Sequence, residues 1–190
     1  FGTTLLASCN TVANDRENSL SLLTPDFAEM PAIGRVDERF QSYNVESVEV
    51  TGGNFWAPYP EPGETVEYDE GPHGTEFSTN AYQNREPIDL RGNQRLRMLT
   101  AALGPAYMRV SGTWANSIYF QDNDEPPMDP PEGYQGVLTR EQWAGVVEFG
   151  KAVDAKILTS FATSDGARDE TGAWNPEQAR RLFAYTQTLG

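Results

Sequence analysis

The sequence has very little of what several large protein classes need. Of its 190 residues, one is a cysteine and one, His73, is a histidine. One cysteine excludes an internal disulfide. The only histidine lies in a Gly-Pro loop, which argues against a histidine-based metal site and a Ser-His-Asp triad. Lys and Arg number 14 against 28 Asp and Glu, a formal net charge of −14. Phosphate binding needs basic patches and none is visible, which argues against nucleic acid as a partner.

Long apolar runs and nucleotide-binding motifs are missing too. No apolar stretch approaches the roughly 18–20 residues of a membrane-spanning helix. No Gly-x-Gly-x-x-Gly motif or phosphate loop follows a predicted strand, which argues against nucleotide-binding folds. What remains is 38% hydrophobic, with 17 Gly and 13 Pro. That composition is typical of a globular, loop-rich domain.

The single cysteine, Cys9, has an informative context. In Leu5-Leu6-Ala7-Ser8-Cys9, a large aliphatic residue and two small residues precede the cysteine. This pattern resembles a bacterial lipoprotein cleavage site, with residues 1–9 as the end of a signal peptide and Cys9 as the lipidated residue. Residues 10–37 are then a flexible tether, and the protein is an extracytoplasmic, envelope-anchored lipoprotein. The alternative is an ordinary N-terminus that happens to contain a cysteine.

Predicted strands and helices alternate after the tether. Short β-branched or apolar runs predict strands at 45–51, 106–111 and 156–162. Helices are predicted after Asp89, after a Thr139/Gln142 capping box and after Asn175-Pro176. The expected apolar faces are Leu96, Leu99 and Leu103; Trp143, Val146, Val147 and Gly150; and Ala179, Leu182, Phe183 and Thr186.

The connections between these elements are lopsided. Turns from helix to strand are short, whereas the long loops 55–88, 112–138 and 163–174 follow strands. This asymmetry is typical of a parallel α/β protein whose site lies at the carboxyl ends of the strands. We therefore predict that residues 38–190 form the N-terminal portion, about three β/α units, of a (β/α)₈ TIM barrel. An open three-layer domain is the alternative. Three strands cannot close a barrel, so we expect a longer chain or a partner to complete the sheet.

The loop 112–138 is acidic, with carboxylates at 122, 124, 125, 129 and 132. Oxygen ligands of this kind suit calcium. Their spacing fits no ordered calcium loop, so we favour a solvated loop and predict neither a metal nor a cofactor.

The stretch 106–120 has the features of a ligand site. Arg109 lies inside a predicted strand, and a buried guanidinium needs an anionic partner because it cannot lose its proton. The strand ends at Gly112-Thr113-Trp114, where a glycine lets the backbone approach a ligand. Alternatives remain for three side chains: a structural ion pair for Arg109, a core aromatic for Trp114, and a turn residue for Asn116.

Leu103-Gly104-Pro105-Ala106-Tyr107-Met108-Arg109-Val110-Ser111-Gly112-Thr113 closely resembles a stretch of heparanase-like enzymes, glycoside hydrolase family 79. Weaker similarities are Phe40–Glu46, Val48–Gly53, Leu96–Leu99 and Trp174-Asn175. The resemblance covers roughly residues 38–190. In this sequence Val110-Ser111 replaces the family's Phe-Gly. Where the family has an Asp near the end of strand one, we place Thr51-Gly52-Gly53-Asn54.

The resemblance implies a retaining β-glucuronidase or heparanase-like enzyme that acts on uronic-acid-containing glycans. Its acid/base and nucleophile glutamates are expected beyond Gly190, so no catalytic residue is assigned in this chain. The expected contribution of this chain is sugar binding by Arg109, Gly112, Thr113, Trp114, Asn116 and Asn54. Two alternatives are a non-catalytic glycan-binding surface lipoprotein and another barrel glycosidase.

Overall fold

The computed structural model describes residues 30–65 and 81–190. The described residues fall into two units divided between Arg35 and Val36. Residues 30–35 of the first unit form neither helix nor strand. Cys9, most of the predicted tether and His73 lie outside the described residues. Within the described ranges, no helix is both long and apolar enough to span a membrane.

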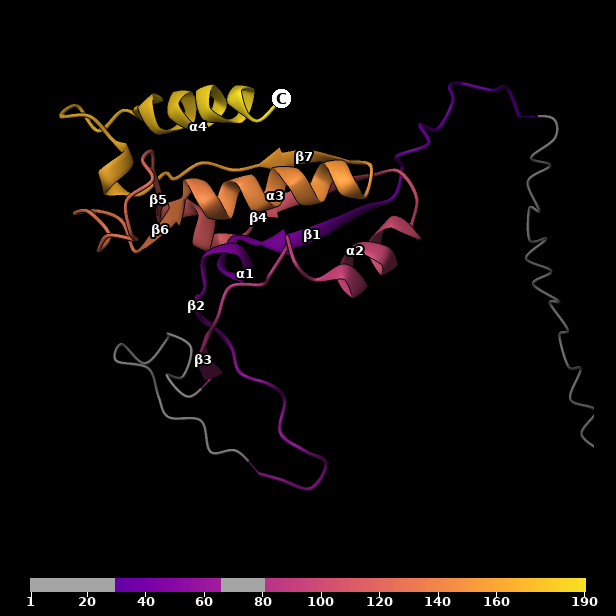
Figure 1. The fold of residues 1–190 in the computed structure, drawn as a ribbon, viewed down its shortest axis with the longest axis horizontal. Coiled ribbons are helices and arrows are strands. Elements are labelled where there is room, and N and C mark those ends of the chain that lie inside the picture. Colours follow the sequence, from indigo (N-terminus) through magenta and orange to yellow (C-terminus); the bar gives the residue numbers. More distant parts are fainter. Residues whose placement is uncertain (1–29, 66–80) are drawn as a thin grey trace, which may run out of the picture. The chain divides into compact units, whose positions relative to one another are not determined.

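The second unit is built on a three-stranded parallel sheet (Figure 1). Its strands are β1 (Ser42–Glu46), β4 (Ala106–Ser111) and β7 (Ala155–Thr159), in that order across the sheet. Helix α2 (Gln94–Ala101) precedes β4 in the chain. Helix α3 (Arg140–Ala152) lies between β4 and β7 in the chain, and α4 (Glu177–Thr188) follows β7. The predicted α/β class with a parallel sheet is confirmed.

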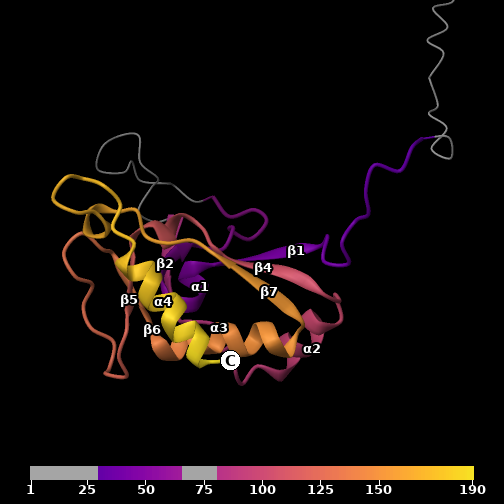
Figure 2. The same ribbon diagram turned by 90° about the horizontal axis from the view of Figure 1, so that it is seen from above.

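The core lies on one face of this sheet. Tyr43, Met108 and Ile157 lie side by side in the register and point toward a cluster that includes Trp143 and Val146 of α3. Met108 and Val146 are completely buried. Figure 2 shows α2, α3 and α4 on the same side of the sheet. The helices of the described residues therefore cover one face of the sheet only.

The opposite face of the sheet is mostly polar and is uncovered among the described residues. Asn44, Arg109 and Leu158 form one row across the three strands, and all three side chains are exposed. Parallel sheets are normally covered on both faces, because their backbone and side chains pack into α/β cores. This polar face is therefore the unusual feature of the fold.

The first strand is shorter than predicted. Residues 45–51 were expected to be one strand, but β1 ends at Glu46 and a single helical turn, α1 (Ser47–Thr51), follows. The Glu49 carboxylate accepts the Glu46 N–H at 2.8 Å, which favours the turn over strand pairing. Val48 and Val50 remain buried in the turn, so their spacing satisfies a helical turn as well as a strand.

Two long loops contain strands that the sequence analysis missed. In the predicted loop 55–88, β2 (Gly53–Trp56) pairs with β3 (Tyr82–Arg85) in an antiparallel hairpin. In the predicted loop 112–138, a 3₁₀ helix (Thr113–Ser117) leads to β5 (Ile118–Gln121), which pairs in parallel with β6 (Gly136–Thr139). Another 3₁₀ turn, Asp165–Ala167, follows β7. Strands of four residues are too short to give a periodic signal.

The helix starts were predicted unevenly. The Thr139/Gln142 capping box is confirmed, with hydrogen bonds of 3.2 and 2.9 Å. The predicted cap Asp89 is wrong, because its carboxylate closes a turn onto Arg91 and Gly92 while Asn93 caps α2.

Two predicted helix faces are wrong in part. Leu99, Leu103 and Phe183 were expected in the core, yet each is more than half exposed. In α2, half-buried Leu96 packs against the core and Thr100 is buried, so the buried side of this helix runs through i and i+4 instead. In α4, Ala179 and Leu182 are buried as predicted.

Candidate functional site

The carboxyl ends of the three sheet strands are tied together by serines. Ser47, which follows β1, donates its hydroxyl to the Ser111 carbonyl at 3.0 Å. The hydroxyl of Ser111, at the end of β4, lies 2.5 Å from that of Ser160, which follows β7. Ser111 is 2% exposed, so these bonds are largely shielded from water. They give the loops beyond the strands a rigid base.

A chain of polar side chains runs along the uncovered face toward this end. Arg109 donates from Nη1 to Asn44 Oδ1 at 2.7 Å, and Asn44 donates from Nδ2 to Glu46 Oε1 at 2.7 Å. The expectation that Arg109 is buried against an anionic partner is wrong, since its side chain is exposed and its described partner is an amide. The effect of this chain is to orient the half-buried Glu46 carboxylate at the end of β1.

Gly112 makes room for that carboxylate. Its backbone has φ 103° and ψ 177°, a region that essentially only glycine occupies. A Cβ atom on Gly112 would overlap the Glu46 carboxylate. The prediction that glycine is needed here for a close approach therefore has a specific basis, although the approaching group in the structure is a side chain of the protein itself.

A Gly112→Ala variant is expected to lose about 2–3 kcal/mol of unfolding free energy, because the backbone is strained and Glu46 must move. Chemical denaturation measures this loss. Gly172→Ala is the matched control: Gly172 also has a positive φ, 81°, but a Cβ there meets nothing within 4 Å. Its loss should be only the backbone cost of about 1–2 kcal/mol.

The double variant Glu46→Ala/Gly112→Ala separates the two terms of this prediction. Removing the Glu46 side chain removes the overlap and leaves the backbone strain, so the double variant should be less destabilised than the sum of the single variants. Equal losses for Gly112→Ala and Gly172→Ala, or strict additivity in the double variant, would show that Glu46 does not depend on this glycine.

The other predicted sugar-contact residues lie in the loops beyond β1 and β4. Thr113 and Asn116 are exposed on the 3₁₀ helix that follows β4. The Asn116 carbonyl accepts the backbone N–H groups of Thr163 and Ser164 at 2.8 and 2.9 Å, which connects this helix to the loop after β7. Trp114 is half-buried and contacts Phe55 edge-on, with ring centroids 5.1 Å apart.

Asn54 and Trp114 line the same cavity. It has a volume of about 220 Å³ and lies between the start of β2 and the 3₁₀ helix, with Ser117 and Gln135 also in its wall. Asn54 and Trp114 are 60 positions apart in sequence, so the fold brings two of the predicted residues together. Arg109 and Gly112 do not line this cavity and belong to the sheet end described above.

The β2–β3 hairpin carries a set of packed aromatic rings. Figure 1 shows it projecting away from the three-stranded sheet. Trp56 and Tyr82 stack with ring centroids 4.7 Å apart, and the Arg85 guanidinium lies 5.4 Å from the Phe55 ring centroid. Arg85 also donates to the Trp56 carbonyl at 2.9 Å. The hairpin is thus held together by its rings and connected to Trp114 through Phe55.

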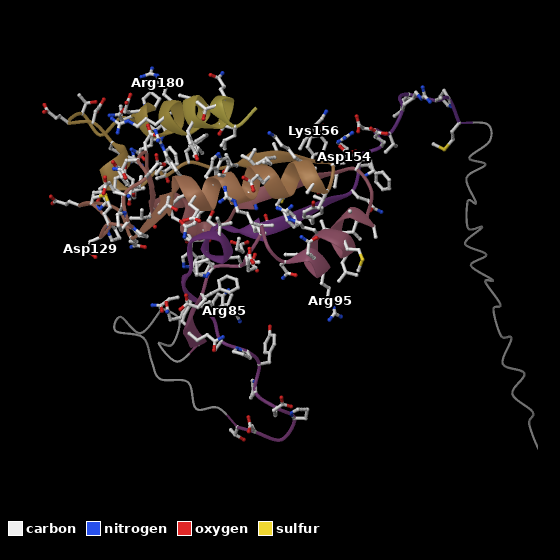
Figure 3. All side chains as sticks on the ribbon, viewed as in Figure 1. Arg85, Arg95, Asp129, Asp154, Lys156 and Arg180 are labelled. Atoms are coloured by element: carbon white, nitrogen blue, oxygen red, sulfur yellow. The ribbon has the colours of Figure 1, made fainter. Side chains whose placement is uncertain are left out.

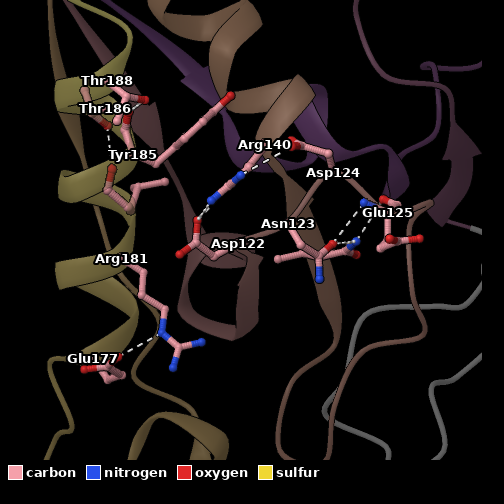
Figure 4. A network of polar contacts seen from close by, with 12 residues as sticks. Asp122, Asn123, Asp124, Glu125, Arg140, Glu177, Arg181, Tyr185, Thr186 and Thr188 are labelled. Carbon is pink, nitrogen blue, oxygen red and sulfur yellow. Dashed lines mark hydrogen bonds and ion pairs between the residues drawn. The ribbon is translucent and has the colours of Figure 1, made fainter.

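Two of the carboxylates after β5 serve the structure. Arg140, the first residue of α3, pairs with Asp122 at 2.9 Å and with Asp124 at 3.4 Å (Figure 4). The hydrogen bond to Asp122 raises the pKa of Arg140, which also lies over the Tyr185 ring of α4. Among residues 30–65 and 81–190, no three His, Cys, Asp or Glu side chains are grouped so that they could hold a metal ion. Other charged side chains, such as Arg95, Asp129 and Arg180, are distributed over the surface (Figure 3).

Sequence reasoning missed two residues that shape this end of the molecule. Glu46 was interpreted as part of a longer strand. The counterpart of the Asp that the resembled family has near the end of strand one was placed at residues 51–54 instead. Gln121 is 1% exposed, and its amide holds the following loop through Glu125, Pro126 and Met128. The spacing of Glu46 and Glu49, three residues apart as in a capping box, could have indicated the role of Glu46. No sequence pattern marks Gln121.

A comparison with models of known protein families finds no match to this chain, and a comparison with curated proteins finds none either.

Proposed function

We propose that this chain forms the first three β/α units of a (β/α)₈ glycosidase that cleaves β-glucuronides with retention of configuration. The observation that carries the proposal is the sheet with helices on one face and a polar, uncovered row on the other, Asn44 and Arg109 beside Leu158. In a (β/α)₈ barrel the helices lie outside, the other face of the sheet points into the barrel, and the carboxyl ends of the strands carry the site.

The strand order favours this architecture over an open α/β sheet. Strands β1, β4 and β7 are neighbours in the order in which the chain reaches them. A doubly wound sheet reverses its order at a switch point and places helices on both faces. The described strands do neither, so continuation of the same pattern leads to a closed barrel with Asn44 and Arg109 facing its interior.

The sheet end supplies sugar-binding and positioning groups. We assign Thr113 and Gly112 to the wall of the sugar site, and Arg109 to positioning: it holds Asn44, which orients Glu46. Glu46 takes the place of the acidic residue near the end of strand one in heparanase-like enzymes. It was overlooked because strand one ends earlier than its residue pattern suggests.

Retaining hydrolysis needs two carboxyl groups about 5–5.5 Å apart. Along the uncovered face, the described strands β1, β4 and β7 present one carboxylate, Glu46. We propose that the acid/base and nucleophile glutamates come from strands beyond Gly190. A non-catalytic glycan-binding protein is the second candidate, because a single carboxylate suffices for binding but not for retaining cleavage.

The extracytoplasmic location is part of the proposal and rests on the Leu5–Cys9 pattern. A lipid on Cys9 would tether the glycosidase to the bacterial envelope. Intact-mass measurement of the mature protein tests it: a diacylglyceryl-modified cysteine at the N-terminus supports the anchor, and an unmodified Cys9 within a longer N-terminus contradicts it.

The function is tested by the protein that carries this chain, with aryl β-glucuronide and aryl β-glucoside as substrates. We expect kcat/KM to favour the glucuronide by about a hundredfold or more, since a site built for the carboxylate rejects an analogue that lacks it. NMR should show the β-anomer of glucuronate as the first product. A glucoside preference indicates another barrel glycosidase, and binding without hydrolysis indicates the second candidate.

A further inference from the structure

We propose that the cavity shared by Asn54 and Trp114 is a subsite for a neutral sugar ring, so that the glycan recognised is unsulfated. This proposal rests on the proposed glycosidase function and specifies its substrate class. The cavity lies beyond the carboxyl ends of β1 and β4, and Trp114 is two residues from Gly112 at the proposed cleavage site. A second ring of the same glycan is the ligand that this position offers.

The polar groups of the cavity suit hydroxyl and acetamido groups. Thr51, Asn54, Ser117 and Gln135 contribute two hydroxyls and two amides to its wall. The Ser117 hydroxyl donates to Gln135 Oε1 at 3.2 Å, which occupies the amide oxygen and leaves the amide nitrogen to act as the donor toward a ligand. Amides and hydroxyls each donate and accept hydrogen bonds, as a sugar hydroxyl does. They can therefore bind a sugar hydroxyl without a charged group.

Trp114 supplies an apolar surface in the same wall. Its indole is held by the edge contact with Phe55, at an interplanar angle of 62°. Phe55 is itself covered by Arg85, which is anchored to the Trp56 carbonyl. The indole is therefore positioned before a ligand arrives, which lowers the entropic cost of stacking a sugar ring against it. A cavity of about 220 Å³ suits one ring rather than a longer segment.

The uncharged lining of the cavity and the acidity of the chain argue against a sulfated ring. None of the described residues that line it is ionisable. The segment between β5 and β6 carries Asp122, Asp124, Glu125, Asp129 and Glu132, and the whole chain has a net charge of −14. Sulfate groups are bound by Arg and Lys clusters, and a negative surface repels them at low salt. The Arg85 guanidinium of the neighbouring hairpin lies over the Phe55 ring and donates to the Trp56 carbonyl, so it is already used within the hairpin.

The test is a ligand-observed NMR titration of the protein that carries this chain with two tetrasaccharides of equal length. One is an unsulfated hyaluronan fragment, in which glucuronate alternates with N-acetylglucosamine, and the other is a sulfated heparin fragment. We expect the unsulfated ligand to bind. Asn54→Ala and Gln135→Ala should each weaken that binding about fivefold, the loss of a hydrogen bond between neutral groups. Both side chains are exposed, so both variants should fold.

Gln187→Ala is the matched control, because Gln187 is an exposed glutamine on α4 outside the cavity wall. Its affinity should equal that of the unaltered chain. The proposal is overturned if the unsulfated ligand does not bind, if Asn54→Ala and Gln135→Ala bind as tightly as the control, or if the heparin fragment binds more tightly. The two failures are distinguishable: failure of the proposed function appears as no turnover of aryl β-glucuronide by the unaltered protein, whereas failure of the subsite appears as equal affinities of the cavity variants and the control.

Discussion

An Arg109→Ala variant of the protein that carries this chain is expected to lose about a hundredfold in kcat for aryl β-glucuronide, with a smaller change in KM. Arg109 anchors Asn44 at 2.7 Å, and Asn44 anchors the Glu46 carboxylate at 2.7 Å. Without the guanidinium this carboxylate is no longer held at the sheet end, and a misplacement of about 1 Å in an active site can cost 10²-fold in rate.

Two further variants separate positioning from folding. Arg109→Lys keeps the charge but not the fork of donors, so we expect a partial rescue of kcat. Arg180→Ala removes a surface arginine on α4, away from the sheet face, and should leave both constants unchanged (Figure 3). Because the Arg109 side chain is exposed, its removal should change the unfolding free energy by less than about 0.5 kcal/mol. An Arg109→Ala enzyme with unaltered kcat would remove Arg109 from the site.

A Trp143→Ala variant is expected to lose about 3–5 kcal/mol of unfolding free energy. Trp143 is 3% exposed, belongs to the core cluster and donates its indole N–H to Thr186 at 2.7 Å, which ties α3 to α4. Domains are stable by only about 5–15 kcal/mol, so this loss is a large fraction of the total stability. Urea denaturation followed by circular dichroism measures the change.

Thr186→Val is the companion variant for this prediction. It removes the acceptor of the indole N–H while keeping the volume of the side chain, and it should cost about 1–2 kcal/mol because a buried donor loses its partner. A Trp143→Ala loss no larger than that of Thr186→Val would mean that the hydrogen bond, and not the packing of the ring, holds α4 on the core.

The parts of the fold that could be predicted are those with dense local signals. Strand β4 is an apolar run that begins after Gly104-Pro105, and α3 begins at a capping box and continues with an apolar face. Both are confirmed almost to the residue. In each case the residues that start the element and the residues that bury it point to the same structure.

The parts that could not be predicted depend on distant partners. The hairpin strand β2 exists because Gly53–Trp56 pairs with residues about 30 positions later, and no local pattern announces that partner. The helical turn after Glu46 is closed locally by the Glu49 carboxylate, but its attachment to the end of β4 depends on Ser47, which donates to the Ser111 carbonyl 64 positions away. The exposure of Arg109 could not be predicted for a similar reason, because the sequence of a parallel strand does not indicate which of its faces the helices will cover.

For the candidate site, the sequence indicated the loops better than the contacts. Asn54 and Trp114 were named separately, and the fold places them in one cavity. Gly112 was predicted to allow a close approach, and the structure has Glu46 in that space. The order of the elements along the chain predicted which loops follow the strands. The contacts between side chains of those loops could be seen only in the three-dimensional structure.

The most direct test of the central claim, that the uncovered sheet face is the inner wall of a sugar site, is a crystal structure of the protein that carries this chain with glucuronate bound. The account predicts that the sugar lies at the carboxyl ends of β1 and β4, in contact with Thr113 and beside Glu46 and Arg109. It also predicts a further parallel strand along the free edge of β7. Glucuronate bound elsewhere, or helices packed on the Asn44–Arg109 face, would contradict it.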